Sequence, residues 1–278
     1  MKPLRLAFVV QRCIPDAFET NLSASLRAVS HAADQKAHMV VFPEMNLSGY
    51  MAGPKIRSIA QPVTAELIQI LSAAADEFDI SILVGMAEAK ENKIYATHLV
   101  FSPHTPMEQY RKIDMAPNEQ AYFSPGNEIQ IFKKKTLHFG IQLCYDAHFP
   151  ELSTAMAVKG ADIIFIPHAS PRGTPKEKYK SWMRHLTARA FDNGVFIAAV
   201  NQTGDNTRGL IFPGLALVIG PDGNIISKFI DPDEKIHIID IDLGALDRVR
   251  SHRMRYFLPN RRSDLFDQEA ILIPILPN

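Results

Sequence analysis

Short apolar runs alternate with amphipathic segments along the first part of the chain. The runs Leu4–Val10 and Met39–Phe42 carry apolar side chains at nearly every position, which is typical of strands buried on both faces. Apolar residues then recur at a spacing of three or four over residues 22–33 and again over 67–78, which predicts two amphipathic helices. The chain therefore opens as strand, helix, strand and helix.

The same alternation continues through the middle of the chain. Short apolar runs predict strands at residues 80–85, 95–101, 137–143, 163–166 and 195–200. Residues 150–159 predict a helix with proline in its first turn, and residues 176–191 predict a longer helix that Gly194 ends. Strands that alternate with helices in this way indicate an α/β fold.

Antiparallel pairing enters near the end of this pattern. The turn sequence Gly220-Pro221-Asp222-Gly223 stands between two apolar runs and predicts a hairpin, and residues 236–241 add a further strand. We expect about ten strands and four or five helices. No Gly/Ser-rich linker separates them, so we expect residues 1–278 to form a single domain, with a C-terminal arm from about Leu246.

Composition and charge exclude several classes of protein. Apolar residues make up 46% of the 278 residues and charged residues 22%, which is enough apolar material for a large core and excludes disorder as the main state. The net charge of zero offers no overall field for nucleic acid or an anionic membrane. Nowhere do 18 uncharged apolar residues run together, so we expect neither a membrane span nor export.

The cysteines and histidines narrow the chemistry further. Cys13 and Cys144 are the two cysteines of the sequence and lie far apart, which excludes a disulfide framework or a CxxC pair and favours a reducing, cytoplasmic location. Ten histidines occur without an HExxH motif or a close pair. We therefore expect no metal site and no cofactor.

Three reactive residues share one position in the pattern, because each follows a predicted strand. They are Glu44, Lys112 and Cys144. Strand ends are where α/β folds gather their active sites. Taken singly, each has an ordinary interpretation, as a solvated loop carboxylate, a surface lysine and a buried inert thiol. Cys13 lies in a polar loop with no matching pattern of partner residues, so we interpret it as an inert thiol.

Together the three side chains could perform nucleophilic catalysis. Cys144 stands at a strand-to-helix turn, where a helix N-terminus and a nearby cation would shift its thiol toward thiolate. Glu44 could act as general base. Lys112 could stabilise the oxyanion that forms when the sulfur attacks a carbonyl or nitrile carbon, an effect of about 3 kcal/mol per donor.

The segments around these residues resemble the nitrilase superfamily of carbon-nitrogen hydrolases, in which glutamate, lysine and cysteine follow in this order. The segments that carry the resemblance are Phe42-Pro43-Glu44 with Leu47-Ser48-Gly49-Tyr50, Tyr110-Arg111-Lys112-Ile113, Cys144-Tyr145-Asp146 with Phe149-Pro150-Glu151, Ser124-Pro125-Gly126, Ala188-Arg189-Ala190 with Asn193, and Asn201-Gln202. The match extends over nearly the whole chain.

This resemblance implies a four-layer α-β-β-α sandwich whose subunits pair into a homodimer or higher homo-oligomer, with the C-terminal arm reaching across. It also implies a thiol-dependent hydrolase that cleaves a small amide or an N-carbamoyl amine. Glu44 would take the thiol proton of Cys144, Lys112 and the backbone N–H of Tyr145 would stabilise the tetrahedral species, and water would hydrolyse the thioester. Glu119 matches a second family glutamate that orients substrate or water.

The resemblance further implies substrate contacts from Tyr50, Tyr145, His148 and Asn201. Two departures from the family pattern concern this part of the site. His148 stands where relatives often have arginine and could contact a substrate carboxylate or cap a helix. Ala216 stands where relatives often have serine, and the missing hydroxyl would remove one hydrogen bond worth about 1 kcal/mol.

Several alternative functions stay open at this point. The surroundings of Cys144 resemble amidases more than true nitrilases, but a nitrilase, an acyl transferase or a catalytically silent scaffold fits the same segments. A papain-like pair of Cys144 with a histidine cannot be judged from spacing. The arginine-rich stretch 248–262 could contact nucleic acid, yet the neutral net charge argues against it. The expected partner is therefore a small-molecule amide substrate, with no nucleic acid and no membrane.

Overall fold

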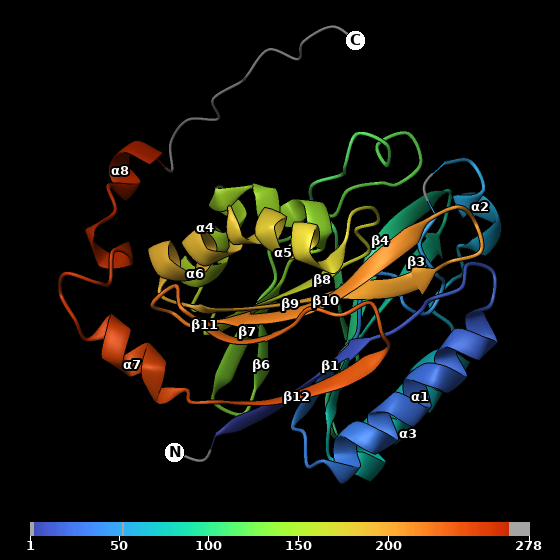
Figure 1. Ribbon diagram of the computed structural model, residues 1–278, viewed down its shortest axis with the longest axis horizontal. Helices are drawn as coiled ribbons and strands as arrows, with labels where there is room; N and C mark the ends of the chain where they lie inside the picture. The colour runs from blue at the N-terminus through green and yellow to red at the C-terminus, as the bar shows by residue number, and fades with distance from the viewer. Residues whose placement is uncertain (1–2, 52, 267–278) are drawn as a thin grey trace, which may run out of the picture.

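Two six-stranded sheets lie face to face, with helices on both outer surfaces (Figure 1). The structure is a computed structural model that describes residues 3–51 and 53–266. The first sheet has the order β12(Lys235–Ile241), β1(Leu4–Val10), β2(Met39–Val41), β3(Ser81–Lys90), β4(Lys93–Phe101), β5(Glu108–Arg111). The second has the order β11(Ile225–Phe229), β10(Ile211–Ile219), β9(Phe196–Asp205), β8(Ile163–His168), β7(Leu137–Ile141), β6(Phe132–Lys134).

The helices form the two outer layers. The first sheet is covered by α1(Phe18–Asp34) and α3(Ala65–Phe78), whereas α4(Pro150–Val158), α5(Pro175–Met183) and α6(Leu186–Asn193) cover the second (Figure 1). The amphipathic pattern explains this placement, because each helix turns its apolar stripe inward. The expected α-β-β-α sandwich is therefore confirmed.

Successive side chains of β1 pack against different layers of the sandwich. Leu6, Phe8 and Val10 belong to the core between the sheets, whereas Ala7 and Val9 pack under the outer helices. All five are at most 3% exposed. Successive side chains of a strand point to opposite faces, so a strand between two apolar layers needs a continuous apolar run.

The helix expected over residues 176–191 is in fact two helices. Thr174 caps α5 through a hydrogen bond from the Glu177 N–H (3.2 Å), and Gly194 ends α6 in the left-handed conformation as expected. Between them the chain turns at Arg184 and His185. Trp182 and Leu186, on either side of this turn, are both buried.

Several short elements carried no periodic signal. They are α2(Ile56–Ile59), β6, α7(Gly244–Arg250), α8(Ser263–Phe266) and the 3-10 helices Cys144–His148 and Leu258–Asn260. At three to seven residues they are too short for periodicity to identify. The described chain thus has twelve strands, slightly more than expected. The expected hairpin at residues 220–223 is confirmed by the antiparallel pairing of β10 and β11.

The beginning of the expected C-terminal arm is docked on its own chain. Arg250 of α7 forms an ion pair with Asp162 (2.7 Å) and donates to the carbonyls of Ala161 (2.8 Å) and Gly194 (3.2 Å). Contact with the same chain continues after α7, since the rings of Phe257 and Phe191 lie 5.5 Å apart. Its last residues, 267–278, lie outside the described part of the chain.

Strand direction brings the predicted reactive residues together. β1, β2 and β3 are parallel, and β5 runs in the same direction as β3 because β4 is antiparallel to both. Glu44 and Lys112 therefore leave the first sheet at the same edge. In the second sheet β7 and β8 are parallel, and Cys144 and Ala169 follow their carboxyl ends. The two edges face each other across the sandwich.

Candidate active site

Glu44 lies in a turn after β2 that both sheets hold in place. The Ala169 N–H donates to its Oε2 (2.9 Å), and the side-chain amide of Gln202 donates to its carbonyl oxygen (2.7 Å). Gly85 of β3 allows the turn to lie close, since a Cβ there would meet the Met45 nitrogen at 2.5 Å. Glu44 is 1% exposed, so its carboxylate is fixed and largely dry.

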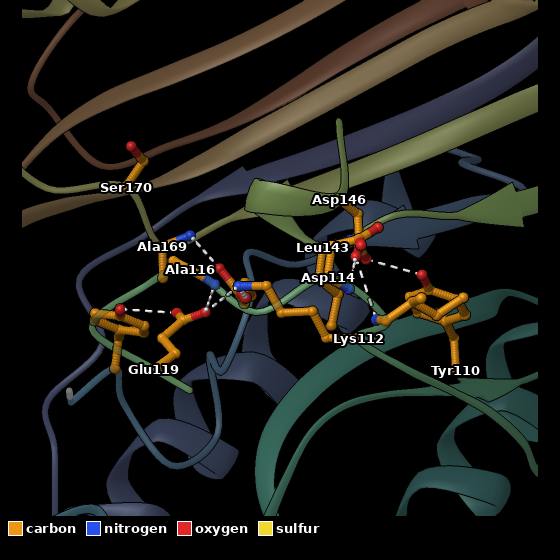
Figure 2. A network of polar contacts seen from close by, with 12 residues as sticks. Tyr110, Lys112, Asp114, Ala116, Glu119, Leu143, Asp146, Ala169 and Ser170 are labelled. Atoms are coloured by element: carbon orange, nitrogen blue, oxygen red, sulfur yellow. Dashed lines mark hydrogen bonds and ion pairs between the residues drawn. The ribbon is translucent and has the colours of Figure 1, made fainter. Parts of the chain in front are cut away.

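Lys112 joins two buried carboxylates. Its Nζ lies 2.9 Å from Glu44 Oε1 and 2.9 Å from Glu119 Oε2, as Figure 2 shows for the labelled Lys112 and Glu119. Its backbone carbonyl accepts from the Gly126 N–H (2.7 Å), and a Cβ at Gly126 would meet the Arg111 oxygen at 2.4 Å. This close approach explains the glycine of the Ser124-Pro125-Gly126 segment.

Glu119 receives two further donors besides the Lys112 ammonium. The Ala116 N–H donates to Oε2 (3.0 Å), and the Tyr50 hydroxyl donates to Oε1 (2.9 Å) (Figure 2). A carboxylate that accepts several hydrogen bonds is held in one orientation. Tyr50 therefore acts on Glu119 directly, and the expected second glutamate lies beside the first.

Cys144 has a strained backbone at the head of the 3-10 helix Cys144–His148. Its φ of +46° lies in the left-handed region, which non-glycine residues adopt rarely. Asp146 ties this turn to the lysine segment, because its carboxylate accepts from the Leu143 N–H (2.8 Å), the Tyr110 hydroxyl (2.8 Å) and the Asp114 N–H (2.7 Å) (Figure 2). Cys144 and Lys112 are therefore positioned by one buried group.

The electrostatics differ from the expectation for Cys144. Burial raises the pKa of the thiol well above its ordinary value, and the Glu44 charge raises it further, whereas Lys112 and Lys178 lower it by less. The isolated protein thus holds a thiol rather than the expected thiolate. The reason is that two carboxylates and a dry surrounding outweigh the cations and the short helix.

Glu44 and Lys112 are shifted in directions that suit proton transfer. Burial raises the pKa of Glu44, and Glu119 adds to this, although Lys112 acts in the opposite direction. Burial alone would lower the pKa of Lys112, but Glu44 and Glu119 outweigh it and raise that pKa well above its ordinary value. Lys112 therefore stays an ammonium while Glu44 can exchange a proton with the thiol.

A cavity of about 600 Å³ opens onto Lys112, whereas Glu44, which accepts a hydrogen bond from Lys112, is not among the residues that line it. The sequence-predicted residues in its wall are Tyr50, Lys112, Glu119, Cys144, Tyr145 and His148. Asn201, which the resemblance expects to contact substrate, is not among the described residues that line the cavity. Its side chain accepts from the Ser170 N–H (2.9 Å) and donates to the Ser170 oxygen (3.0 Å), so Asn201 shapes the wall from behind.

The sequence profile of the carbon-nitrogen hydrolase family matches residues 6–251 of this chain. This chain belongs to the carbon-nitrogen hydrolase family. The resemblance found in the glutamate, lysine and cysteine segments is thereby confirmed, and the chain is a carbon-nitrogen hydrolase enzyme.

Characterised relatives of this carbon-nitrogen hydrolase include amidases. An (R)-stereoselective amidase of Pseudomonas sp is 30% identical over 253 residues, covering 90% of this chain and 88% of that protein. The omega-amidase NIT2 of Danio rerio is 31% identical over 282 residues, covering 98% and 99% of the two chains. A crystal structure of an amidase from Nesterenkonia sp. superposes with a TM-score of 0.80 at 23% identity, covering 96% of each chain, and shows the shared fold.

The two departures from the family pattern have different surroundings. The ring centroids of His148 and His185 lie 4.6 Å apart with the rings tilted. Burial together with Arg189 lowers the pKa of His148, so its imidazole is neutral at pH 7. Ala216 is fully buried in β10 within the core between the sheets. A serine hydroxyl there would need its own partner, so the alanine suits this core.

Among the cavity residues that no motif singled out are Arg172, Asn206 and Arg208. They lie on the loops after β8 and β9, where no motif or spacing singled them out.

Neither a metal site nor a membrane helix is found in the described chain. Residues 3–51 and 53–266 contain no group of three or more His, Cys, Asp or Glu side chains arranged to hold a metal ion. None of the helices in these ranges is long and apolar enough to cross a bilayer.

Proposed function

We propose that this chain is a thiol-dependent amidase that hydrolyses the carbon–nitrogen bond of a small linear amide or an N-carbamoyl amine through a thioester on Cys144. The observation that carries this proposal is Lys112 held between Glu44 and Glu119 at one cavity with Cys144. In support, two relatives are amidases, and a structural neighbour carries the acetamide moiety of fluoroacetamide on its active-site cysteine.

The first half of the reaction forms the thioester. Glu44 accepts the Cys144 proton as the sulfur attacks the carbonyl carbon, and the carbonyl electron pair moves onto oxygen. The Lys112 ammonium and the Tyr145 N–H stabilise that oxyanion. Glu44 then returns the proton to the nitrogen, the carbon–nitrogen bond breaks, and ammonia or an amine leaves. The thiol can wait protonated, because ionisation is needed only during attack.

The second half hydrolyses the thioester. Water enters the position of the departed amine and loses a proton to Glu44, while Glu119 orients it together with Tyr50. The tetrahedral species collapses with loss of the sulfur, which regains the proton from Glu44. Lys112 stabilises the oxyanion in both halves, so one fixed arrangement of charges serves the full cycle.

The test measures ammonia release and covalent labelling together. Wild type, Cys144→Ala and Cys13→Ala would be assayed with small amides, N-carbamoyl amines and nitriles, and intact mass would be recorded after fluoroacetamide. We expect turnover and labelling in wild type and in Cys13→Ala, whose buried thiol is a matched control, and neither in Cys144→Ala.

Three results would point elsewhere. Faster release from nitriles than from amides would indicate a true nitrilase. Hydroxamate formation that outruns hydrolysis when hydroxylamine is added would indicate an acyl transferase. A folded wild type that neither turns over nor takes the label would contradict catalysis and favour the scaffold.

We also propose that residues 1–278 act as one domain that forms a homodimer through the outer face of α4 and α6. Val158 and Phe191 are 56% and 44% exposed there, and Phe257 of the C-terminal arm lies 5.5 Å from Phe191. An exposed apolar patch of this kind favours a protein contact. Light scattering would show a dimer for wild type and a monomer for Val158→Glu if this face is the interface.

A reducing, cytoplasmic location is the last part of the proposal. Its support is the free thiol of Cys144, which the proposed mechanism needs in reduced form. Fractionation of the source cells would test it.

A further inference from the structure

A lysine that no motif singled out holds one wall of the cavity from behind. Lys178 of α5 is half-buried, and its ammonium donates to Ser170 Oγ (2.7 Å) and to the Pro171 oxygen (3.0 Å). Both acceptors belong to residues that line the cavity together with Cys144. Asn201 fixes the same segment through the Ser170 N–H (2.9 Å) and the Ser170 oxygen (3.0 Å). The cavity wall at this point is therefore held by two side chains.

This wall segment is joined to the proposed general base. Ala169, which is labelled beside Ser170 in Figure 2, donates its N–H to Glu44 Oε2 (2.9 Å). Ala169 follows β8 directly, so the place of its N–H depends on the course of the chain through Ser170. A displaced segment would move the donor that orients the Glu44 carboxylate. Lys178 therefore acts on Glu44 through the backbone of one loop.

The charges of the site leave the sulfur without a cation of its own. Lys112 Nζ lies 2.9 Å from a carboxylate oxygen of Glu44 and 2.9 Å from one of Glu119, so one ammonium serves two carboxylates. When Glu44 takes the Cys144 proton, the S–H bond breaks, an O–H bond forms, and the negative charge moves to the sulfur. Lys112 is then shared between the sulfur and Glu119. A second cation near Cys144 would lower the free energy of this charged state.

Lys178 has the charge and the surroundings for this role. It forms no ion pair with any residue of the ranges 3–51 and 53–266, and its two oxygen acceptors are neutral and favour the ammonium form. Burial lowers the pKa of Lys178, and the charge of Cys144 raises it. Burial and Glu44 raise the pKa of Cys144, whereas Lys112 and Lys178 lower it. A partly buried cation is stabilised when a negative charge forms near it.

Other basic side chains near the sulfur are less suited to this role. Arg172 and Arg208 line the cavity but are exposed, so water and salt screen their charges. Burial lowers the pKa of three neighbouring histidines, so their imidazoles are neutral at pH 7. These histidines are His148, His168 and His185. Lys178 differs from both groups, because it is partly shielded from water and carries a charge.

We propose that Lys178 is a positioning residue for the attack of Cys144: it holds the cavity wall at residues 169–171 and provides a second positive charge for the sulfur while Glu44 carries the proton. This inference rests on the proposed thiol-dependent mechanism and adds a residue that lies outside the glutamate, lysine and cysteine segments. The reaction should therefore depend on the charge at position 178, and not only on the hydrogen bonds made there.

The first experiment follows the thiol without turnover. The rate at which iodoacetamide alkylates Cys144 would be measured between about pH 7 and pH 10 by mass spectrometry of the peptide that contains it. Lys178→Gln keeps a side-chain donor but loses the charge. It should be alkylated about tenfold more slowly than wild type at each pH, which corresponds to a rise of about one unit in the pKa of Cys144.

Two further variants separate charge from packing. Lys178→Arg keeps the charge and should be alkylated at nearly the wild-type rate. Lys180→Gln removes the same charge from an exposed position of α5 and should leave the alkylation rate unchanged. Lys178→Met is a second neutral variant, which gives the same test if Lys178→Gln does not fold.

Ammonia release tests the same variants during turnover. Lys178→Gln should lower kcat/KM for the best amide about tenfold, less than the loss of about 10²–10³ for a direct oxyanion donor, because Lys178 acts from behind the wall. Lys178→Arg should restore most of this loss. The pH profile and the rescue by arginine follow the charge, whereas a purely structural role would change neither with the charge.

Two results would overturn the inference. One is a folded Lys178→Gln that is alkylated at the wild-type rate, and the other is a Lys178→Arg as slow as Lys178→Gln. Alkylation needs no substrate, so it also separates this inference from the proposed function. A wild type that hydrolyses no amide would contradict the amidase proposal, and the alkylation rates would still decide whether Lys178 acts on the Cys144 sulfur.

Discussion

Removing the Lys112 ammonium perturbs stability and catalysis through different partners. In Lys112→Met, which keeps much of the apolar volume, Glu44 and Glu119 would face each other without their shared cation. Breaking a buried ion pair costs about 3–5 kcal/mol. Because the raised pKa of Glu44 lets that group take up a proton, we expect the lower end, a loss of about 3 kcal/mol in the free energy of unfolding.

Catalysis should suffer more than stability in this variant. Loss of one oxyanion donor lowers kcat by about 10²–10³, and a protonated Glu44 can no longer accept the thiol proton. Urea unfolding and ammonia release at pH 7.5 would measure the two effects separately. Adding Glu119→Gln to Lys112→Met should restore about 1–2 kcal/mol of stability, because one carboxylate disappears, without restoring turnover.

Two results would refute this reasoning. A Lys112→Met variant as stable as wild type would mean that the carboxylates are not dependent on the lysine. A double variant less stable than Lys112→Met would mean that Glu119 contributes through Tyr50 and Ala116 rather than through charge. Glu119→Gln alone serves as the control, since it keeps the Glu44–Lys112 pair.

Three further measurements follow from the geometry. Because burial and Glu44 raise the pKa of Cys144, its alkylation by iodoacetamide in the absence of substrate should accelerate through pH 9; a plateau near neutral pH would show a preformed thiolate. Burial also raises the pKa of Cys13 to about 12, whereas an unfolded thiol ionises near 8.5, so the free energy of unfolding should fall above about pH 9. It should fall less steeply with pH in Cys13→Ala, and equal slopes in the two proteins would contradict this. Gly85→Ala should lower kcat far more than Gly140→Ala. The new Cβ at position 85 would meet the Met45 backbone at 2.5 Å, whereas the one at position 140 would meet the flexible Met156 side chain at 2.6 Å. Similar activities would show that the Glu44 turn tolerates displacement.

The sequence by itself was enough for the elements with strong local signals. The apolar run of β1, the stripes of α1 and α3, and the Gly220–Gly223 turn each follow from side-chain chemistry within a few residues, and the structure confirms them. The order of Glu44, Lys112 and Cys144 indicated the family for a similar reason, because each reactive residue sits in its own short segment. A sequence pattern predicts an element well when residues close together in the chain determine its conformation.

Tertiary structure decided what depends on neighbours distant in the chain. The helix expected over residues 176–191 is interrupted at Arg184 and His185, and the Asn201 side chain turns from the cavity to hold Ser170. Cys144 is a thiol rather than a thiolate because Glu44, one hundred positions earlier, lies in the same dry site. The burial of a side chain and the pKa of an ionisable group depend on all the groups that surround it in space. The spacing of residues along the chain does not say which groups those are.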